Sequence, residues 1–182
     1  VAFDSAAVLT TADTNGLRDV YVHDRDLDTD GTMDEPVATA TRRVSVASSG
    51  AQAIGGDSVD ASVTGDGRYV VFASAASTLV AGDTNGLTDV FVRDRVTGTT
   101  ERVSVNSNEV QGNFGHATPS ISADGRYVAF SSDSLRLVPL DTNWRIDIFV
   151  RDRQMGTTER VSVDSNGAEA NGDSYTAAIS AD

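Results

Sequence analysis

Carboxylates are concentrated in one short stretch of this sequence, residues 25–36, which reads RDLDTDGTMDEP. The order D-x-D-x-D-G-x-x-D places acidic side chains at alternate positions and a glycine where the chain can turn sharply. Calcium takes roughly six to eight oxygen ligands, and alternate side chains before such a turn can converge on one ion. Without a cation, these neighbouring carboxylates would repel one another. We therefore predict a calcium site with the ligands Asp26, Asp28, Asp30, Thr32 (through its carbonyl) and Asp34.

A second acidic pattern, D-x-N-x-x-x-D, occurs three times. It offers side-chain oxygens at even spacing, with a backbone carbonyl as a further donor. Asn-Gly is also a strong hairpin-turn signal, so a plain turn is the alternative. The third copy replaces glycine with Trp144, a poor residue for positive φ, while the acidic residues remain, and this favours calcium. The predicted ligands are Asp13, Asn15, Leu17 and Asp19; Asp83, Asn85, Leu87 and Asp89; and Asp141, Asn143, Arg145 and Asp147.

The inserted loop resembles the calcium loops of integrin-type propellers. It departs from the EF-hand, which requires a bidentate Glu at position 12. One Ca²⁺ in this loop and one in each D-x-N-x-x-x-D copy would reduce the formal net charge from −13 to −5. Calcium is the cofactor that we expect, because the chain has no cysteine and so must hold a metal mainly through oxygen.

Charge and hydropathy exclude several classes of partner. The chain has 27 acidic residues against 14 Lys and Arg, a balance that repels nucleic acid and anionic lipid. No apolar run approaches the ~18 residues of a membrane span. We therefore expect protein partners, with neither nucleic-acid binding nor membrane insertion.

Residues of other catalytic types occur without a catalytic pattern. The R-D-R triplets at residues 93–95 and 151–153 recur at one position of a repeat, which is typical of structural ion pairs between strands. His116 has no partner motif nearby in sequence. We therefore expect no enzyme site in this chain.

The chain is built from repeats. DGRYVVF at residues 66–72 returns as DGRYVAF at residues 124–130, and GTTERVSV returns with the same 58-residue offset. An earlier copy is longer because it contains the acidic insertion, residues 25–40. Each unit has four β-like runs bounded by turn residues; in the third unit we expect them at residues 121–122, 126–132, 147–153 and 158–163.

Four short strands in each unit are typical of a β-propeller blade. We predict an all-β fold of three four-stranded antiparallel blades, in preference to a β-sandwich or a β-helix. Residues 1–182 form one segment with blades at 1–60, 61–118 and 119–176, and residues 177–182 supply the inner strand of a further or swapped blade.

The run PSISADGRYVAFSS, followed by D-[IV]-[FY]-V and T-x-R-V-S-V, resembles the WD-like repeat of TolB-type bacterial propellers over essentially the whole chain. This resemblance implies an exported bacterial protein, at the cell surface or in the periplasm, whose propeller is a docking platform. It does not imply catalysis.

Three blades are fewer than the roughly four to eight that close a propeller. The chain is then a fragment of a longer propeller, half of a two-chain ring, or a unit that donates strands head to tail into a filament through complementary ends. The expected function is a calcium-stabilised extracellular scaffold for protein binding or self-assembly. The alternatives are a periplasmic TolB-like docking module and a fragment of a propeller enzyme whose active site lies in other blades.

Overall fold

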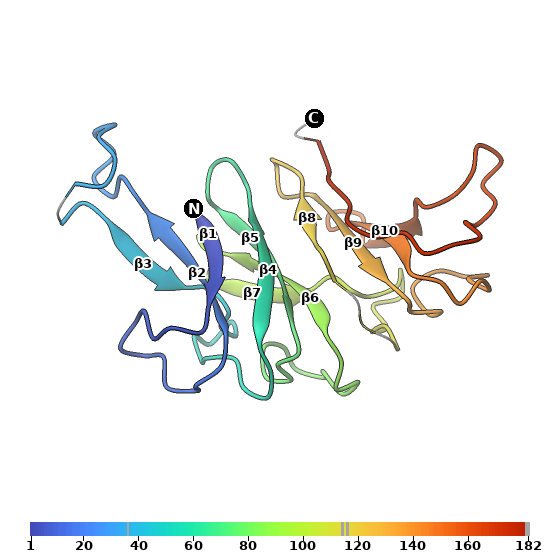
Figure 1. Ribbon diagram of the computed structural model, residues 1–182, viewed down its shortest axis with the longest axis horizontal. Helices are drawn as coiled ribbons and strands as arrows, with labels where there is room; N and C mark the ends of the chain where they lie inside the picture. Colours follow the sequence, from blue (N-terminus) through green and yellow to red (C-terminus); the bar gives the residue numbers. More distant parts are fainter. Residues whose placement is uncertain (36, 114, 116, 181–182) are drawn as a thin grey trace.

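The computed structural model describes residues 1–35, 37–113, 115 and 117–180. These residues form three antiparallel sheets and no helix (Figure 1). The first sheet contains β1 (Ala2–Ser5), β2 (Asp19–Asp24) and β3 (Ala40–Arg43). The second contains β4 (Ser58–Val63), β5 (Tyr69–Ser74), β6 (Asp89–Asp94) and β7 (Thr99–Arg102). The third contains β8 (Ser120–Ile121), β9 (Tyr127–Ser132), β10 (Asp147–Asp152) and β11 (Thr157–Arg160).

Strands follow one another in sequence order across each sheet, so every unit is a β-meander. The all-β prediction is confirmed, and the four runs expected in the third unit match β8 to β11 closely. The first sheet has three strands instead of the expected four, because β1 corresponds to β5 and β9, the second strands of the other units. β4 lies across the expected boundary at residues 60 and 61 and pairs with β5, so the second sheet begins at Ser58. Residues 177–180 form no strand, and residues 181–182 lie outside the described part.

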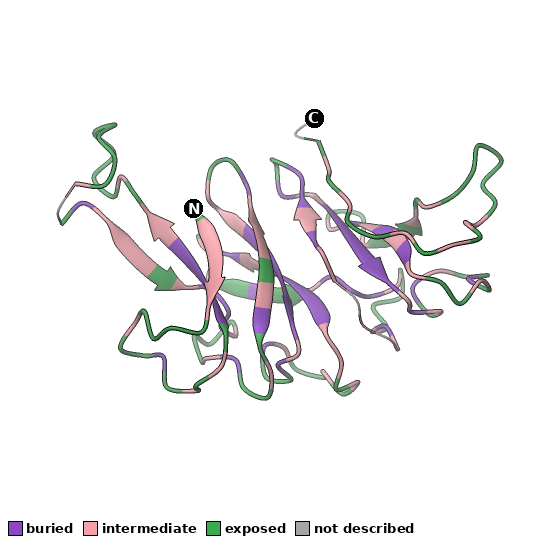
Figure 2. Ribbon diagram, viewed as in Figure 1, coloured by how far each residue is buried: buried purple, intermediate pink, exposed green. Residues whose placement is uncertain are grey.

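The second sheet is covered on both faces, as the figures show (Figures 1 and 2). Successive side chains of a strand point to opposite faces. On β5, Val70 and Phe72 therefore pack against the first sheet, where they contact a cluster that includes Val20. Val71, between them, packs against the third sheet in a cluster with Phe130. The core thus lies between the sheets, and the middle sheet contributes to both halves of it.

An aromatic pair occupies the same place in each sheet. Phe72 lies opposite Phe91 in the β5–β6 register, with stacked rings 5.9 Å apart. Stacked pairs with centroids 6.0 Å apart occur at the matching positions of the other two sheets. The sequence repeat is therefore also a repeat of side-chain packing.

The aspartate of each R-D-R triplet forms an ion pair between strands. Asp94 accepts hydrogen bonds from Arg68, and Asp152 accepts hydrogen bonds from Arg126. Each ion pair links the start of one strand to the end of the next strand. The hydrogen bonds from Arg126 lower the pKa of Asp152 to about 2. The pKa of Asp94 is lowered by Arg68 in the same way.

Leu79 and Leu9 test how far stability depends on sheet-to-sheet packing. Each precedes an aspartate of the D-x-N pattern by four residues, but Leu79 is 2% exposed and Leu9 is 42% exposed. We expect Leu79→Ala to lower the free energy of unfolding by about 3 kcal/mol, because it leaves a cavity between sheets. Leu9→Ala should cost less than about 1 kcal/mol. Urea unfolding measures both changes, and equal losses would contradict the packing described above.

Candidate functional site

The inserted loop brings three of its predicted ligands together. Asp26, Asp28 and Asp30 each offer a carboxylate oxygen, and these atoms lie within 4.8 Å of one another. Asp26 accepts hydrogen bonds from the backbone N–H groups of Asp30 (3.1 Å) and Gly31 (3.0 Å). Gly31 has φ of 89°, a conformation that glycine adopts without strain, and it turns the chain back toward Asp26. The loop therefore holds a compact and largely exposed group of carboxylates.

The other two predicted ligands of this loop lie differently. Asp34 is bound by Arg25, whose Nε and Nη2 atoms donate to its carboxylate at 3.0 and 2.5 Å. These hydrogen bonds lower the pKa of Asp34. Thr32 donates its backbone N–H to Asp30 Oδ1 at 2.7 Å. Asp34 as a calcium ligand stays a prediction that would require it to leave Arg25.

The three D-x-N-x-x-x-D copies have one common geometry. In the first copy, Asn15 donates from Nδ2 to Asp19 (3.1 Å) and to the carbonyl of Ala53 (3.0 Å). Its Oδ1 accepts the backbone N–H of Leu17 at 3.0 Å. Matching bonds are made by Asn85 and by Asn143, each of which bonds to the later aspartate and to the backbone N–H two residues on, Leu87 and Arg145. The asparagine thus uses its oxygen to close a turn in all three copies.

The turn itself persists where glycine is missing. Trp144 has φ of 56°, close to the values of 70° at Gly16 and 67° at Gly86. The third copy therefore adopts the left-handed conformation despite its bulky side chain. This finding removes the sequence argument that used Trp144 to favour calcium over a turn.

An arginine lies between the two aspartates of each copy. In the first, Arg43 Nη1 lies 3.3 Å from Asp13 Oδ1 and 3.1 Å from Asp19 Oδ2. Arg102 bridges Asp83 and Asp89 in the same way, and Arg160 bridges Asp141 and Asp147. We call each of these groups a carboxylate–arginine cluster.

A serine completes each carboxylate–arginine cluster. Ser45 donates to Asp19 Oδ1 at 2.5 Å, and Ser104 and Ser162 donate to Asp89 and Asp147 at the same distance. These arginines and serines belong to the repeated R-V-S-V segment, which is the signal that sequence reasoning did not use. Calcium at the three copies stays a prediction, and protein groups supply the contacts that the structure gives these carboxylates.

The clusters differ in one donor. Tyr21 donates its hydroxyl to Asp13 Oδ2 at 2.5 Å, whereas the matching residues are Phe91 and Phe149. Burial raises the pKa of Asp83 and Asp141, the counterparts of Asp13. Burial together with the bond to Asp13 raises the pKa of Tyr21 to about 12.

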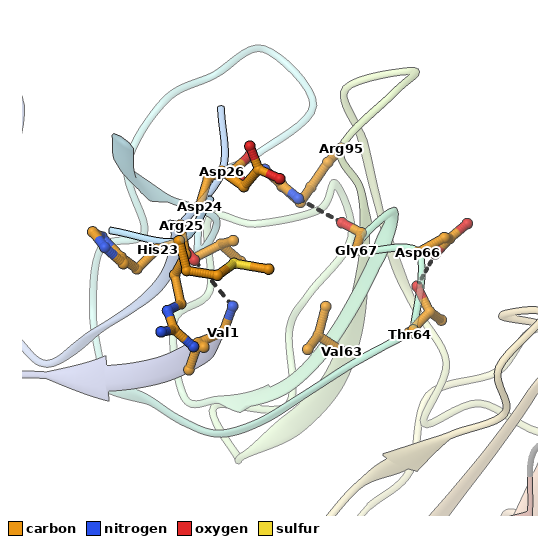
Figure 3. Close-up of a pocket in the computed structure, with 13 residues that line it drawn as sticks. Val1, His23, Asp24, Arg25, Asp26, Val63, Thr64, Asp66, Gly67 and Arg95 are labelled. Atoms are coloured by element: carbon orange, nitrogen blue, oxygen red, sulfur yellow. Dashed lines mark hydrogen bonds between the residues drawn. The ribbon is translucent and has the colours of Figure 1, made fainter. Parts of the chain in front are cut away.

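A hollow of about 490 Å³ opens between the first and second sheets beside the inserted loop (Figure 3). It is lined by Asp26 and Met33 on one side and by the hairpin around Gly67 on the other. Two of its polar side chains bond to neighbouring groups: Arg95 donates to the carbonyl of Gly67 (2.6 Å), and Thr64 donates to Asp66 (2.5 Å). Figure 3 shows these bonds at the rim of the hollow.

Comparisons with known proteins give a fold-level similarity only. No family model matches the chain, and no curated protein matches it. TolB from Acinetobacter baumannii is 17% identical, with a TM-score of 0.44, over 79% of this chain and 26% of that one. A putative TolB from Agrobacterium tumefaciens is 17% identical, with a TM-score of 0.45, over 81% of this chain and 42% of that one. The chain thus spans less than half the length of these two solved structures.

Within the described ranges, no helix has the length and apolar character needed to cross a membrane. His116 lies outside the described residues.

Tyr21 tests the importance of the carboxylate–arginine cluster for stability. Tyr21→Phe leaves Asp13 without its hydroxyl donor in a buried place, so we expect the free energy of unfolding to fall by about 1–2 kcal/mol. Tyr175→Phe is the control, because Tyr175 is 58% exposed and donates to Asp173 at 3.3 Å. Urea unfolding at neutral pH compares the two variants, and an equal effect of both would show that the cluster has no special role.

Proposed function

We propose that this chain is a segment of a β-propeller that acts as a non-catalytic scaffold and binds protein, its own copies included, through uncovered blade faces. One observation carries the proposal. Val161 and Val163 of the third sheet are 44% and 40% exposed, whereas Val103 and Val105, at the same positions of the second sheet, are 2% and 3% exposed. The third sheet therefore leaves exposed the apolar positions that another sheet covers on the second sheet.

The same difference extends across the strand beside it. Ile148 and Val150 of β10 are half-buried, whereas Val90 and Val92 of β6 are buried beneath the third sheet. An apolar face of this kind binds another apolar surface, since burying a large aliphatic side chain contributes about 1.5–3 kcal/mol. We therefore infer that the partner is a protein with an apolar surface that covers this face.

The propeller interpretation is supported by how the three sheets are arranged. Each is an antiparallel meander of short strands, and each packs its face against the next. The edge strand β1 of the first sheet contacts β4, the first strand of the second sheet, and β4 in turn contacts β8, the first strand of the third sheet. Further blades, or another chain, complete the ring or extend the array.

Calcium is proposed at the inserted loop. Asp26, Asp28 and Asp30 are close enough to share one ion, and the exposed position leaves room for water ligands. Such a site has few protein ligands and so binds weakly, in the range of extracellular calcium modules, about 10⁻⁴–10⁻³ M. A site of this affinity fills outside the cytosol, which supports an extracellular or periplasmic location.

Catalysis is not part of the proposed function. The buried carboxylates of the three clusters each contact an arginine, and the later aspartate of each cluster also accepts a serine hydroxyl, so they are held as structural groups. The acidic groups of the inserted loop are largely exposed, and the Thr64 hydroxyl in the neighbouring hollow donates to Asp66 (2.5 Å). This arrangement supports a binding module.

The calcium proposal is tested by thermal unfolding in chelator, in millimolar Ca²⁺ and in Mg²⁺. We expect Ca²⁺ at about ten times its dissociation constant to raise the unfolding temperature by about 3–6 °C, because the ion binds the folded chain alone. Asp28→Asn should abolish this shift, and Asp173→Asn, which changes an exposed carboxylate elsewhere, should keep it. No calcium-specific shift in the wild-type chain would exclude calcium from the account.

The uncovered face is tested by sedimentation velocity over a range of protein concentrations in Ca²⁺. We expect the wild-type chain to self-associate and Val163→Glu to weaken that association by at least about tenfold, because docking would bury an unpaired carboxylate. Val96→Glu is the matched control, since Val96 is 74% exposed in the turn between β6 and β7. A wild-type chain that remains monomeric at every concentration would contradict the proposed self-association.

A further inference from the structure

We propose that the third sheet of one copy docks on the first sheet of a second copy, through the polar contacts that join successive sheets within the chain. This inference rests on the proposed function and names the partner surface and its register. The first and third sheets lie on opposite sides of the second (Figure 1), so in the part of the chain that the structure describes each has one face without a neighbouring sheet.

The junction between the first and second sheets defines the contact. Thr100 Oγ1 donates to the carbonyl of Val46 (2.6 Å), and Thr100 N donates to Ser48 Oγ (2.9 Å). Arg93 Nη1 donates to the carbonyl of Ala47 (3.2 Å). A turn after the last strand of one sheet thus receives an arginine and a threonine from the next sheet.

The junction between the second and third sheets repeats it. Thr158 Oγ1 donates to the carbonyl of Val105 (2.5 Å), and Thr158 N donates to Ser107 Oγ (3.0 Å). Arg151 Nη1 donates to the carbonyl of Asn106 (3.2 Å). Two independent junctions therefore use the same three bonds.

The accepting half of this contact is present again at the third sheet. Val163, Asp164 and Ser165 occupy the places of Val105, Asn106 and Ser107, and they are exposed. Their turn has the same form, because the N–H three residues after Asp164 bonds to its carbonyl (3.0 Å), as occurs after Asn106 (2.9 Å). The acceptors are thus already in the docking geometry.

The donating half is present at the first sheet. His23 and Thr41 stand opposite each other in the β2–β3 register, as Arg93 and Thr100 do in β6–β7. Thr41 is half-buried, whereas Thr100 is buried, and the His23 side chain is 34% exposed. The imidazole replaces the guanidinium as the donor, and Nδ1 lies 2.9 Å from Thr41 Oγ1.

Charge favours the pairing of these two ends. At the junction of the second and third sheets, Arg153 binds Glu101 (2.5 Å) and lies over the Tyr69 ring, 4.6 Å from its centroid. The counterparts for the proposed contact are Glu159 of the third sheet and Arg25 of the first, which have opposite charges. Arg25 is bound to Asp34 within its own loop, and its side chain is 45% exposed, so it remains accessible from outside.

Apolar groups flank the polar contact on both sides. Val161 and Val163 are exposed on the third sheet, and Leu9 is exposed on the first. At the two internal junctions, the counterparts of all three are buried between sheets. The third sheet and the first sheet are therefore two different surfaces that complement each other, and the contact is head to tail.

The experiment blocks one end at a time and then mixes the variants. Thr41→Arg blocks the first-sheet face, and Val163→Arg blocks the third-sheet face. Each variant alone should be monomeric in sedimentation velocity, because it lacks one half of every contact. A 1:1 mixture should form a dimer and nothing larger, since the free third sheet of one variant meets the free first sheet of the other.

Controls keep this test separate from folding and from the proposed function. Thermal unfolding confirms that each variant is folded, and Leu9→Glu is a second first-sheet variant that should form a dimer with Val163→Arg in the same way.

His23→Arg restores the donor used at the internal junctions and should tighten the association of the otherwise wild-type chain about tenfold, as a charged hydrogen bond does. Self-association of either blocked variant alone would overturn the head-to-tail contact and leave the proposed binding function standing. A monomeric wild-type chain would contradict the proposed self-association and the head-to-tail contact together.

Discussion

Each sheet of this chain has apolar side chains on both faces, and removing them from water requires another surface to cover each face. The second sheet meets this requirement, since adjacent residues of β5 pack alternately against the first and third sheets. Among the described residues, the outer faces of the first and third sheets lack such a cover, and Leu9, Val161 and Val163 are exposed there. The need to cover these faces links the fold to the proposed binding function.

Buried charge is the second constraint, and it determines how each sheet is joined to its loops. Asp19 and Asp147 are fully buried, so each requires a compensating partner. Arg43 and Arg160 provide that partner from the last strand of the same sheet, and they also reach the aspartate that begins the loop. One arginine in each unit thus contacts aspartates from both a strand and a loop. This shared contact explains why the arginine and the two aspartates recur in every repeat.

The sequence is sufficient to predict the repeat, the all-β class and the strands, because hydrophobic alternation and turn residues are local signals. It is also sufficient to place Asp26, Asp28 and Asp30 together, since a short loop with a glycine has few ways to fold. It does not reveal that Arg43 enters the acidic D-x-N pattern, because that contact depends on strand pairing between segments about thirty residues apart. Nor does it reveal that Trp144 adopts positive φ, which the surrounding turn imposes against its local preference. The sequence also does not decide whether Asp34 joins the other carboxylates of the inserted loop or pairs with Arg25, because both partners are a similar distance from it in sequence.

Amide hydrogen exchange, followed residue by residue at low and high protein concentration, reports which sheet faces become covered when chains associate. We predict that the amides of Thr41 and of the turn at residues 163–165 gain protection as concentration rises. The amides of β5 and β6, already covered on both sides, should be the best protected at every concentration and should not change. Equal protection of all three sheets, with no change at either outer face, would contradict the claim that uncovered sheet faces are the binding surfaces of this protein.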